Sequence, residues 1–302
     1  MLTKTFLSGL FAMSLGLALV LTAAASGTSG GLVLTQGAGA RTQALAETGA
    51  GASGTVDSLY WNPAGMASVD GLQAQATYLM GMEESAYQQL LAGYPVAGLG
   101  TFGLGLSLLQ GGAVDLDQAD GSFVSVQSQS DWAVSIGYGV QVSSGVRAGA
   151  AVKMLNSTLV EKYTASAFAG DVGLQVAAAA GLVLGAVVQN IGTEITYESE
   201  GDPLPLTLRA GAAYSTRLAA GHELILLADG LKPNDRDFAL HVGAEYAYAG
   251  LLAARLGYKA GYDIEGLTAG LGVRWSVLEL DYAFGLVQEL TSTHRISLLV
   301  RL

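Results

Sequence analysis

The stretch 131-DWAVSIGYGVQ-141 decides the fold, because its side chains alternate in character from one residue to the next. One phase holds Trp132, Val134, Ile136, Tyr138 and Val140, and the other holds Ala133, Ser135, Gly137, Gly139 and Gln141. Successive side chains of a β-strand point to opposite sides, so this period of two predicts a strand with one apolar face and one small or polar face.

The same alternation continues from Leu72 to the end of the chain and predicts fourteen strands. Each candidate has about the ten residues that a tilted strand needs to cross a bilayer. They are centred on 72–80, 86–95, 99–109, 131–141, 145–155, 166–176, 181–191, 205–215, 222–231, 238–248, 250–259, 266–275, 277–287 and 293–302.

Charged side chains take the polar phase of these strands, while the opposite phase is aliphatic or aromatic. A soluble β-sandwich would turn its polar face to water, whereas a barrel in lipid turns it inward, so the pattern alone leaves both open. In a barrel, the lumen charges would be Arg147, Lys153, Asp171, Arg209, Glu223, Asp229, His241, Glu245, Arg255, Lys259, Arg274, Glu279, Asp281, Arg295 and Arg301.

The lengths of the connections favour the barrel. Those after odd-numbered strands are long or polar, as in 110–130 and 192–204, whereas most of those after even-numbered strands are tight, as in 142–144 and 177–180. Short periplasmic turns alternate with longer outer loops in barrels of the outer membrane, and aromatic residues near strand ends fit an interface girdle. We therefore predict an all-β fold, a transmembrane antiparallel β-barrel of about 14 strands over residues 71–302.

Composition excludes several classes of function. The 302 residues include 51% hydrophobic and 13% charged residues, no cysteine, and a net charge of −11. A nucleic-acid partner is not expected, because phosphate binding needs a concentrated basic surface. The lack of cysteine removes disulfides, thiolate catalysis and zinc–thiolate sites, and we expect neither a cofactor nor a metal site.

The N-terminus has the features of an export signal. Lys4 precedes an apolar run over 6–21, which is followed by Ala23-Ala24-Ala25. A basic start, an apolar stretch and small residues at the end predict a signal peptide over residues 1–25, with an N-terminal membrane anchor as the alternative. Together with the barrel, this signal predicts the outer membrane of a Gram-negative-type bacterium, with lipid of that membrane as a partner.

Residues 26–70 do not alternate and precede the first strand. They contain helix formers in 41-RTQALAET-48, a stretch 49-GAGASG-54 that we expect to be flexible, and the turn sequence 58-SLYWNPAGMA-67. We predict that this segment folds into the lumen as a hatch or plug, where bent backbone is tolerated. Its motif is Trp61, Asn62, Pro63, Ala64 and Gly65; the alternative is a plain turn with Trp61 anchored at the membrane interface.

An enzyme is not expected. The histidines, His222, His241 and His294, lie on different predicted strands, and neither a Gly-x-Ser-x-Gly nor a His-Glu-x-x-His sequence occurs. His241 and Glu245 share a strand face and could belong to a catalytic set. We expect them instead to form a lumen pair in a ladder of opposite charges, since buried charges are tolerated when paired.

Two stretches resemble a known family. The sequence 36-QGAGARTQALAETGAGASGTVDSLYWNPAGMA-67 and the closing part of 255–302, with 280-LDYAF-284 and 293-THRISL-298, are similar to the PorV/PorQ family of FadL-like outer-membrane barrels. The resemblance implies a fourteen-stranded barrel with an N-terminal hatch that bears an Asn-Pro-Ala element, here Asn62, Pro63 and Ala64. The chain departs from the usual barrel pattern in ending with Leu302 rather than an aromatic residue.

The resemblance leads to two hypotheses on function. PorV-like proteins work beside the type IX secretion machinery, which implies a secretion or surface-assembly component that meets secreted proteins. FadL-like transporters move long-chain fatty acids or other hydrophobic molecules when the hatch rearranges, which implies a passive transporter as the alternative. A continuous apolar groove past the hatch would favour transport, and a lumen closed by ion pairs would favour a scaffold.

The outer loops are acidic, which predicts a solvated surface or, alternatively, a docking face for a basic partner.

Overall fold

A computed structural model of the chain describes residues 28–81, 84–118, 121–263, 265–287 and 292–302. The predicted signal peptide, residues 1–25, lies outside this part. No helix among the described residues is both long and apolar enough to span a bilayer.

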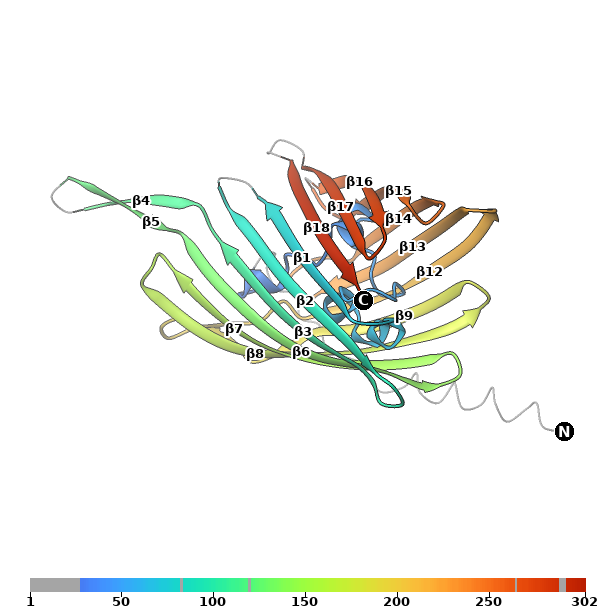
Figure 1. Ribbon diagram of the computed structural model, residues 1–302. Coiled ribbons are helices and arrows are strands. Elements are labelled where there is room, and N and C mark those ends of the chain that lie inside the picture. The colour runs from blue at the N-terminus through green and yellow to red at the C-terminus, as the bar shows by residue number, and fades with distance from the viewer. Residues whose placement is uncertain (1–27, 82–83, 119–120, 264, 288–291) are drawn as a thin grey trace.

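The main body is a closed barrel of fourteen antiparallel strands, in which the first strand pairs with the last (Figure 1). Its strands are β1 (Gln73–Met80), β2 (Ala86–Val96), β3 (Gly100–Gln110), β6 (Gln129–Ser143), β7 (Val146–Leu159), β8 (Tyr163–Ala179), β9 (Leu182–Gly192), β12 (Thr207–Ala219), β13 (His222–Pro233), β14 (Ala239–Tyr248), β15 (Leu252–Ala260), β16 (Glu265–Trp275), β17 (Leu278–Val287) and β18 (Thr293–Arg301). Every predicted strand is present, and the fold class is confirmed.

Closure excludes the sandwich. β1 pairs with β18 from Gln73 opposite Arg301 to Met80 opposite His294, so the sheet has no free edge. The start of β1 and the end of β18 therefore lie at the same end of the barrel, where the tight turns are. We call this the short-turn end and the opposite one the long-loop end. The connections keep the predicted parity with one exception: β7 and β8 are joined by only three residues, 160–162, because both strands extend into the connection that we predicted over 156–165.

Two of the long connections contain additional strands that the sequence analysis treated as loops. β4 (Ala113–Asp117) pairs with β5 (Phe123–Gln127), and β10 (Ile195–Thr196) pairs with β11 (Gly201–Asp202). The first hairpin forms because Val114 and Leu116 alternate with Asp115 and Asp117, which is the same period of two found in the wall.

Burial alternates along the wall with the predicted phase. In β1 and β3, side chains that point into the lumen are buried, and their neighbours on the outside are exposed. The outer face carries large apolar side chains such as Leu104, Ile136 and Leu271, all more than half exposed. Aromatic residues of the predicted girdle are also exposed there, namely Tyr94, Tyr214, Tyr246, Tyr248, Tyr258, Trp275 and Tyr282. An apolar exterior around a polar interior is the arrangement of a barrel in lipid.

The lumen is filled by what we call the N-terminal segment, residues 28–72. It contains η1 (Leu32–Leu34), α2 (Ala40–Ala44), α3 (Ser58–Trp61) and η2 (Pro63–Ser68). Gly30 N–H donates to Pro203 O in a long-loop connection, and Leu72 O accepts from Leu302 N–H at the short-turn end. The segment therefore crosses the lumen from one end to the other before the first strand begins.

Candidate functional site

The Asn-Pro-Ala turn lies at the centre of the N-terminal segment and is buried in the lumen. Asn62 is extended (φ −159°, ψ 104°), and its Oδ1 accepts from Ala64 N–H at 3.1 Å, which begins η2 with Pro63 in the first position. Its Nδ2 donates to Ala50 O at 2.8 Å and to Leu174 O of β8 at 3.3 Å. Asn62 thus joins two parts of the segment to each other and to the wall.

The wall can accommodate this turn because the wall residues at the point of contact are glycines, which have no side chain. A β-carbon on Gly173 would overlap Asn62 Oδ1, and one on Gly185 would overlap Ala50 O. Glycine is needed where backbone or a short side chain must approach so closely. Pro63, Ala64 and Gly65 are buried as well, and η2, which they begin, packs against β3, β6, β7 and β8.

Trp61 is only 3% exposed, and its Nε1 donates to Ala38 O at 2.9 Å. The guanidinium of Arg209 lies 5.1 Å from the centre of the ring, within the range of a cation–π contact. The alternative prediction, an anchor for Trp61 at the membrane interface, is therefore wrong, because the segment carries the ring into the lumen.

Residues 49–54, which the sequence led us to expect as a flexible stretch, are held by the wall. Gly49 and Ala50 N–H both donate to Asp229 Oδ2, at 2.8 and 2.9 Å. Gln175 Nε2 donates to Ala50 O and Ala52 O. A carboxylate and an amide of the wall thus supply the partners that buried backbone requires, and the expectation of flexibility was wrong.

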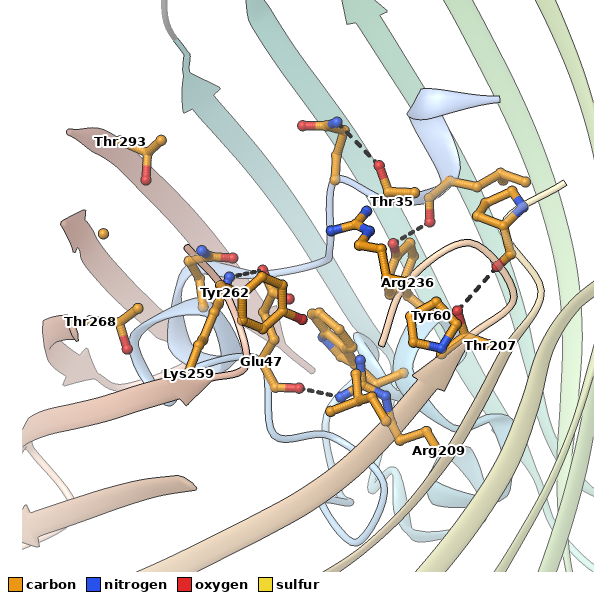
Figure 2. A pocket seen from close by; sticks show the side chains of 18 of the residues that line it. Thr35, Glu47, Tyr60, Thr207, Arg209, Arg236, Lys259, Tyr262, Thr268 and Thr293 are labelled. Carbon is orange, nitrogen blue, oxygen red and sulfur yellow. Dashed lines mark hydrogen bonds and ion pairs between the residues drawn. The ribbon is translucent and has the colours of Figure 1, made fainter. Parts of the chain in front are cut away.

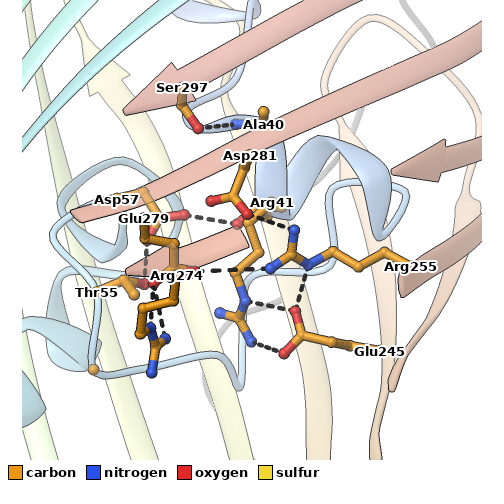
Figure 3. Close-up of polar contacts among 12 residues, drawn as sticks. Ala40, Arg41, Thr55, Asp57, Glu245, Arg255, Arg274, Glu279, Asp281 and Ser297 are labelled. Carbon is orange, nitrogen blue, oxygen red and sulfur yellow. Dashed lines mark hydrogen bonds and ion pairs between the residues drawn. The ribbon is translucent and has the colours of Figure 1, made fainter. Parts of the chain in front are cut away.

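A network of charges joins the N-terminal segment to β14, β15 and β17 (Figure 3). Arg41 of α2 binds both oxygens of Glu245, at 2.8 and 3.0 Å. Arg255 bonds the same carboxylate and donates to Asp281 Oδ1 at 2.6 Å, and its Nη2 lies 3.8 Å from Glu279 Oε1. We call Arg41, Glu245, Arg255, Glu279 and Asp281 the central charge cluster.

The cluster ends at the rim of the short-turn end. Glu279 Oε2 accepts from Arg274 Nη2 and from Arg301 Nη2, each at 2.8 Å. The Arg274 side chain is 45% exposed, compared with 2% for Arg255. Arg274, which we predicted among the lumen charges, thus lies at the mouth, because it is next to the last residue of β16.

Most of the other predicted lumen charges are buried against a partner on the wall or the segment. Glu223 is exposed and Arg301 is half-buried, because each lies near the short-turn end of its strand. Lys153 Nζ lies 2.7 Å from Asp171 Oδ2, and Arg209 Nη1 lies 3.0 Å from Asp229 Oδ2. Arg147 donates to Ser68 Oγ and Arg295 to Gln36 O, both on the N-terminal segment. Polar partners of this kind are what make buried charges tolerable.

His241 and Glu245 are not partners, contrary to our expectation. His241 Nε2 bonds the Tyr262 hydroxyl at 2.9 Å, while Glu245 bonds the two arginines. Residues four apart in a strand are separated by about 13 Å, whereas residues opposite each other on neighbouring strands are close. Glu245 accordingly lies opposite Arg255 in the register of β14 and β15. Among the described residues, no three His, Asp or Glu side chains are placed to hold a metal ion.

The charges of the segment itself were not among the predicted site residues. Arg41 binds Glu245, and Glu47 Oε1 accepts from Lys259 Nζ at 2.8 Å. They are among the few charges in a stretch of small and apolar residues that we predicted to enter the lumen. That was a signal that they would meet charges of the wall.

Two cavities lie on either side of the segment. The outer cavity, of about 260 Å³, faces the long-loop end and is lined by residues that include Tyr60, Trp61, Arg209, Lys259 and Tyr262 (Figure 2). The inner cavity, of about 240 Å³, is lined by Arg41, Thr55, Glu245 and Arg255, among others, and also by Arg274 and Arg301 of the short-turn rim. No residue lines both cavities, so the segment and its charge cluster lie between them.

We expect the ion pair between Glu47 and Lys259 to make the stability of the fold depend on pH. Burial would raise the pKa of Glu47, but the neighbouring Lys259 lowers it from 4.5 to about 2. A carboxylate with a lowered pKa stabilises the fold fully above pH 4.5 and loses this contribution as the pH falls to about 2. The contribution is on the order of 3 kcal/mol. The free energy of unfolding of the wild type and of Glu47→Gln, measured against pH, should converge over this interval; parallel curves would contradict the assignment.

Replacing Asn62 with Ala should loosen the segment and leave the barrel folded. Ala50 O and Ala64 N–H would each lose a buried partner, at a cost of about 1–3 kcal/mol, while no hydrogen bond between wall strands is touched. Single-channel recordings should show more frequent openings. Asn156→Ala is a matched control, because Asn156 bonds Ser166 on the exposed face. Unchanged recordings for Asn62→Ala would count against a gating role for the turn.

Known proteins resemble this chain in fold. No protein-family model and no curated protein matches the sequence. Among solved structures, the Pseudomonas putida toluene transporter TodX superimposes with a TM-score of 0.65 at 15% identity, over 88% of this chain and 99% of that one. The Ralstonia pickettii toluene transporter TbuX gives 0.59 at 14% identity, over 88% and 98% of the two chains. This chain has the fold of the FadL-like outer-membrane barrels.

A FadL homologue of Pseudomonas aeruginosa agrees, with a TM-score of 0.55 at 11% identity over 87% of this chain and 98% of that one. All three likenesses span nearly the whole of the known structures. The shared fold does not by itself identify a substrate.

Proposed function

We propose that the protein is a passive channel of the outer membrane for small hydrophobic or amphipathic molecules. The observation that carries this proposal is the position of the N-terminal segment, which crosses the lumen between one cavity at each end. A channel of this design would be closed at rest, and a shift of the segment would join the two cavities.

The outer cavity is suited to a molecule about the size of one aromatic ring. Its volume of about 260 Å³ falls just below the usual range for small-molecule sites. Tyr60, Trp61 and Tyr262 offer ring surfaces, and Leu34, Leu79 and other aliphatic residues line it as well. TodX and TbuX, which share the fold, are toluene transporters, and this supports a substrate of similar size.

The same cavity has cationic groups that suit the acidic end of an amphipathic molecule. Arg295 is buried and lines the cavity, and its Nε and Nη1 have no hydrogen-bond partner. No carboxylate among the described residues forms an ion pair with it. A buried guanidinium that has a carbonyl partner but no carboxylate keeps free donors and favours an anionic group nearby.

Uptake into liposomes tests the proposal. The purified protein in lipid vesicles should speed the entry of labelled toluene or benzoate over protein-free vesicles and leave the entry of glucose unchanged. Arg295→Met should slow benzoate more than toluene. If neither probe enters faster with the wild-type protein than without it, the channel proposal fails.

A second candidate is a secretion or surface-assembly component of the PorV/PorQ type. One observation favours it over transport: the central charge cluster closes the lumen with buried ion pairs rather than an apolar groove. The resemblance of residues 36–67 and 255–302 to that family adds to this. A pull-down of the native protein from outer membranes, followed by mass spectrometry, should then yield secreted proteins that share a C-terminal domain. Recovery of apolar small molecules without such proteins would favour the channel.

The proposed location is the outer membrane, with residues 1–25 acting as the export signal, residues 26–70 as the hatch and residues 71–302 as the barrel. The continuous apolar exterior and the exposed aromatic side chains support this location. Fractionation of cells that express the full chain should place the protein, with its N-terminus cleaved near Ala25, in the outer membrane.

A further inference from the structure

The hairpin of β4 and β5 extends beyond the wall of the barrel (Figure 1). The wall strands on either side of the hairpin end before it. On one side β2 begins at Ala86, opposite Gln110 of β3, and on the other side β7 ends at Leu159, opposite Gln129 of β6. β4 and β5 lie past both positions, and among the described residues they pair only with each other. We call this hairpin, Ala113–Asp117 with Phe123–Gln127, the arm.

The two faces of the arm differ in chemistry. Val114 lies opposite Val126, and Leu116 opposite Val124, so that one face is aliphatic. The other face carries Asp115 and Asp117, opposite Ser125 and Phe123. All five residues of β4 are exposed, including Val114 and Leu116 at 38% each, and Val124 is 47% exposed. The aliphatic face therefore has little of the cover that such side chains find in a folded protein.

The arm also has a free strand edge. At its base, Gln127 N–H of β5 donates to Glu161 Oε1, whereas no described strand pairs with the outer edge of β4. A two-stranded hairpin is marginally stable in water, and a third strand with a shared apolar face stabilises it. Unpaired backbone groups on an edge are a template for such a strand.

We propose that the outer edge of β4 is a docking site for an extended segment of another protein, in which aliphatic and basic residues alternate. The segment adds as a third strand, with main-chain hydrogen bonds to β4. Its aliphatic side chains continue the face of Val114 and Leu116, and its basic side chains lie beside Asp115 and Asp117. Strand addition gives affinity through the backbone and specificity through alternate side chains.

The charges of the arm disfavour other occupants. A second copy of the chain would bring Asp115 and Asp117 against the same carboxylates, and like charges directly opposite each other destabilise a pair of strands. An anionic lipid surface would be repelled for the same reason, and the net charge of −11 adds to both effects. A segment of another protein with alternating aliphatic and basic residues can pair with the free edge of β4, cover its aliphatic face and place basic groups beside its carboxylates.

Binding of a designed peptide tests the proposal. The probe is a fluorescein-labelled ten-residue peptide that alternates isoleucine and lysine, and the full-length protein is held in lipid nanodiscs. Fluorescence anisotropy should show saturable binding to the wild type. Two matched probes accompany it: one with glutamate in place of lysine, and one with alternate backbone amides N-methylated, which removes the strand-forming donors. Both should bind at least about tenfold more weakly.

Variants of the arm locate the site. Val114→Ser with Leu116→Ser, and Asp115→Asn with Asp117→Asn, should each weaken binding of the isoleucine–lysine peptide about tenfold. Glu198→Gln with Glu200→Gln is the matched control, because it removes two exposed carboxylates from another outer loop. Since none of these residues belongs to the wall, heat-modifiable migration in gels should stay unchanged. Equal binding to wild type and arm variants, equal binding of the N-methylated peptide, or no binding to the wild type would each overturn the proposal.

Discussion

Deleting residues 36–68 should raise the single-channel conductance of the barrel roughly tenfold, because a fourteen-stranded barrel without its contents encloses a water-filled lumen. The deletion removes α2, α3 and η2 together, and with them Arg41, Glu47 and the Asn-Pro-Ala turn. Wall carboxylates that lose a partner on the segment, such as Glu245, which binds Arg41, and Asp229, which accepts from Gly49 and Ala50 N–H, would then face water and remain hydrated. Planar-bilayer recordings of the purified variant measure the effect.

The barrel should still insert and close without the segment. Every one of the fourteen strands pairs with its neighbours through backbone hydrogen bonds that do not involve residues 36–68. Removal of the arm, residues 113–127, serves as the control, since it deletes a hairpin outside the lumen and should leave the conductance unchanged. If the variant lacking 36–68 fails to fold, the segment is part of the folding core and its role as a movable hatch is excluded.

Replacing Arg255 with Met should lower the free energy of unfolding by about 3–5 kcal/mol, the usual cost of removing one partner from a buried ion pair. Arg255 bonds Glu245 and Asp281 and lies near Glu279, and its side chain is 2% exposed. Met retains much of the volume of the side chain but no charge, so the carboxylates would remain buried with fewer partners. Urea unfolding of the barrel in lipid vesicles measures the difference.

Arg274→Met is the matched control for this prediction. Arg274 bonds Glu279 from the rim, where its side chain is 45% exposed, and Arg301 bonds the same carboxylate. Its removal should cost less than about 1 kcal/mol, as for other solvent-exposed ion pairs. Combining Arg255→Met with Asp281→Asn should recover part of the stability, because one of the unpaired carboxylates is then neutral. Equal losses for Arg255→Met and Arg274→Met would show that burial does not govern the cluster.

The charged residues of the lumen have two separate roles. Arg255 and the wall carboxylates hold neighbouring strands together, whereas Arg41 attaches the N-terminal segment to the same cluster. In the proposed channel, a shift of the segment that joins the two cavities would therefore break the bidentate pair of Arg41 with Glu245. The wall can remain intact during that step, since Glu245 keeps its bond to Arg255.

Local patterns in the sequence were enough to predict the number of barrel strands, their approximate positions and the face that most of their residues occupy. These features follow from a period of two and from the lengths of connections, and both are local properties of the chain. Alternation in 131–141 already specified which side chains of β6 point outward. Closure of the sheet followed from the even count and the regular parity of long and short connections.

Which groups meet inside the barrel depends on contacts between residues that are distant in the sequence. The partner of Glu245 is Arg255 on the next strand and Arg41 in the segment, rather than His241 on its own strand. Asn62 took its place because the wall offers Gly173 at the contact, whereas Trp61 packs close to Gly37 and Gly49 of the segment itself. Such contacts join residues that are far apart in the chain, as Arg41 and Glu245 are. They depend on the register between strands and on the path of the segment, which no local pattern of side chains encodes.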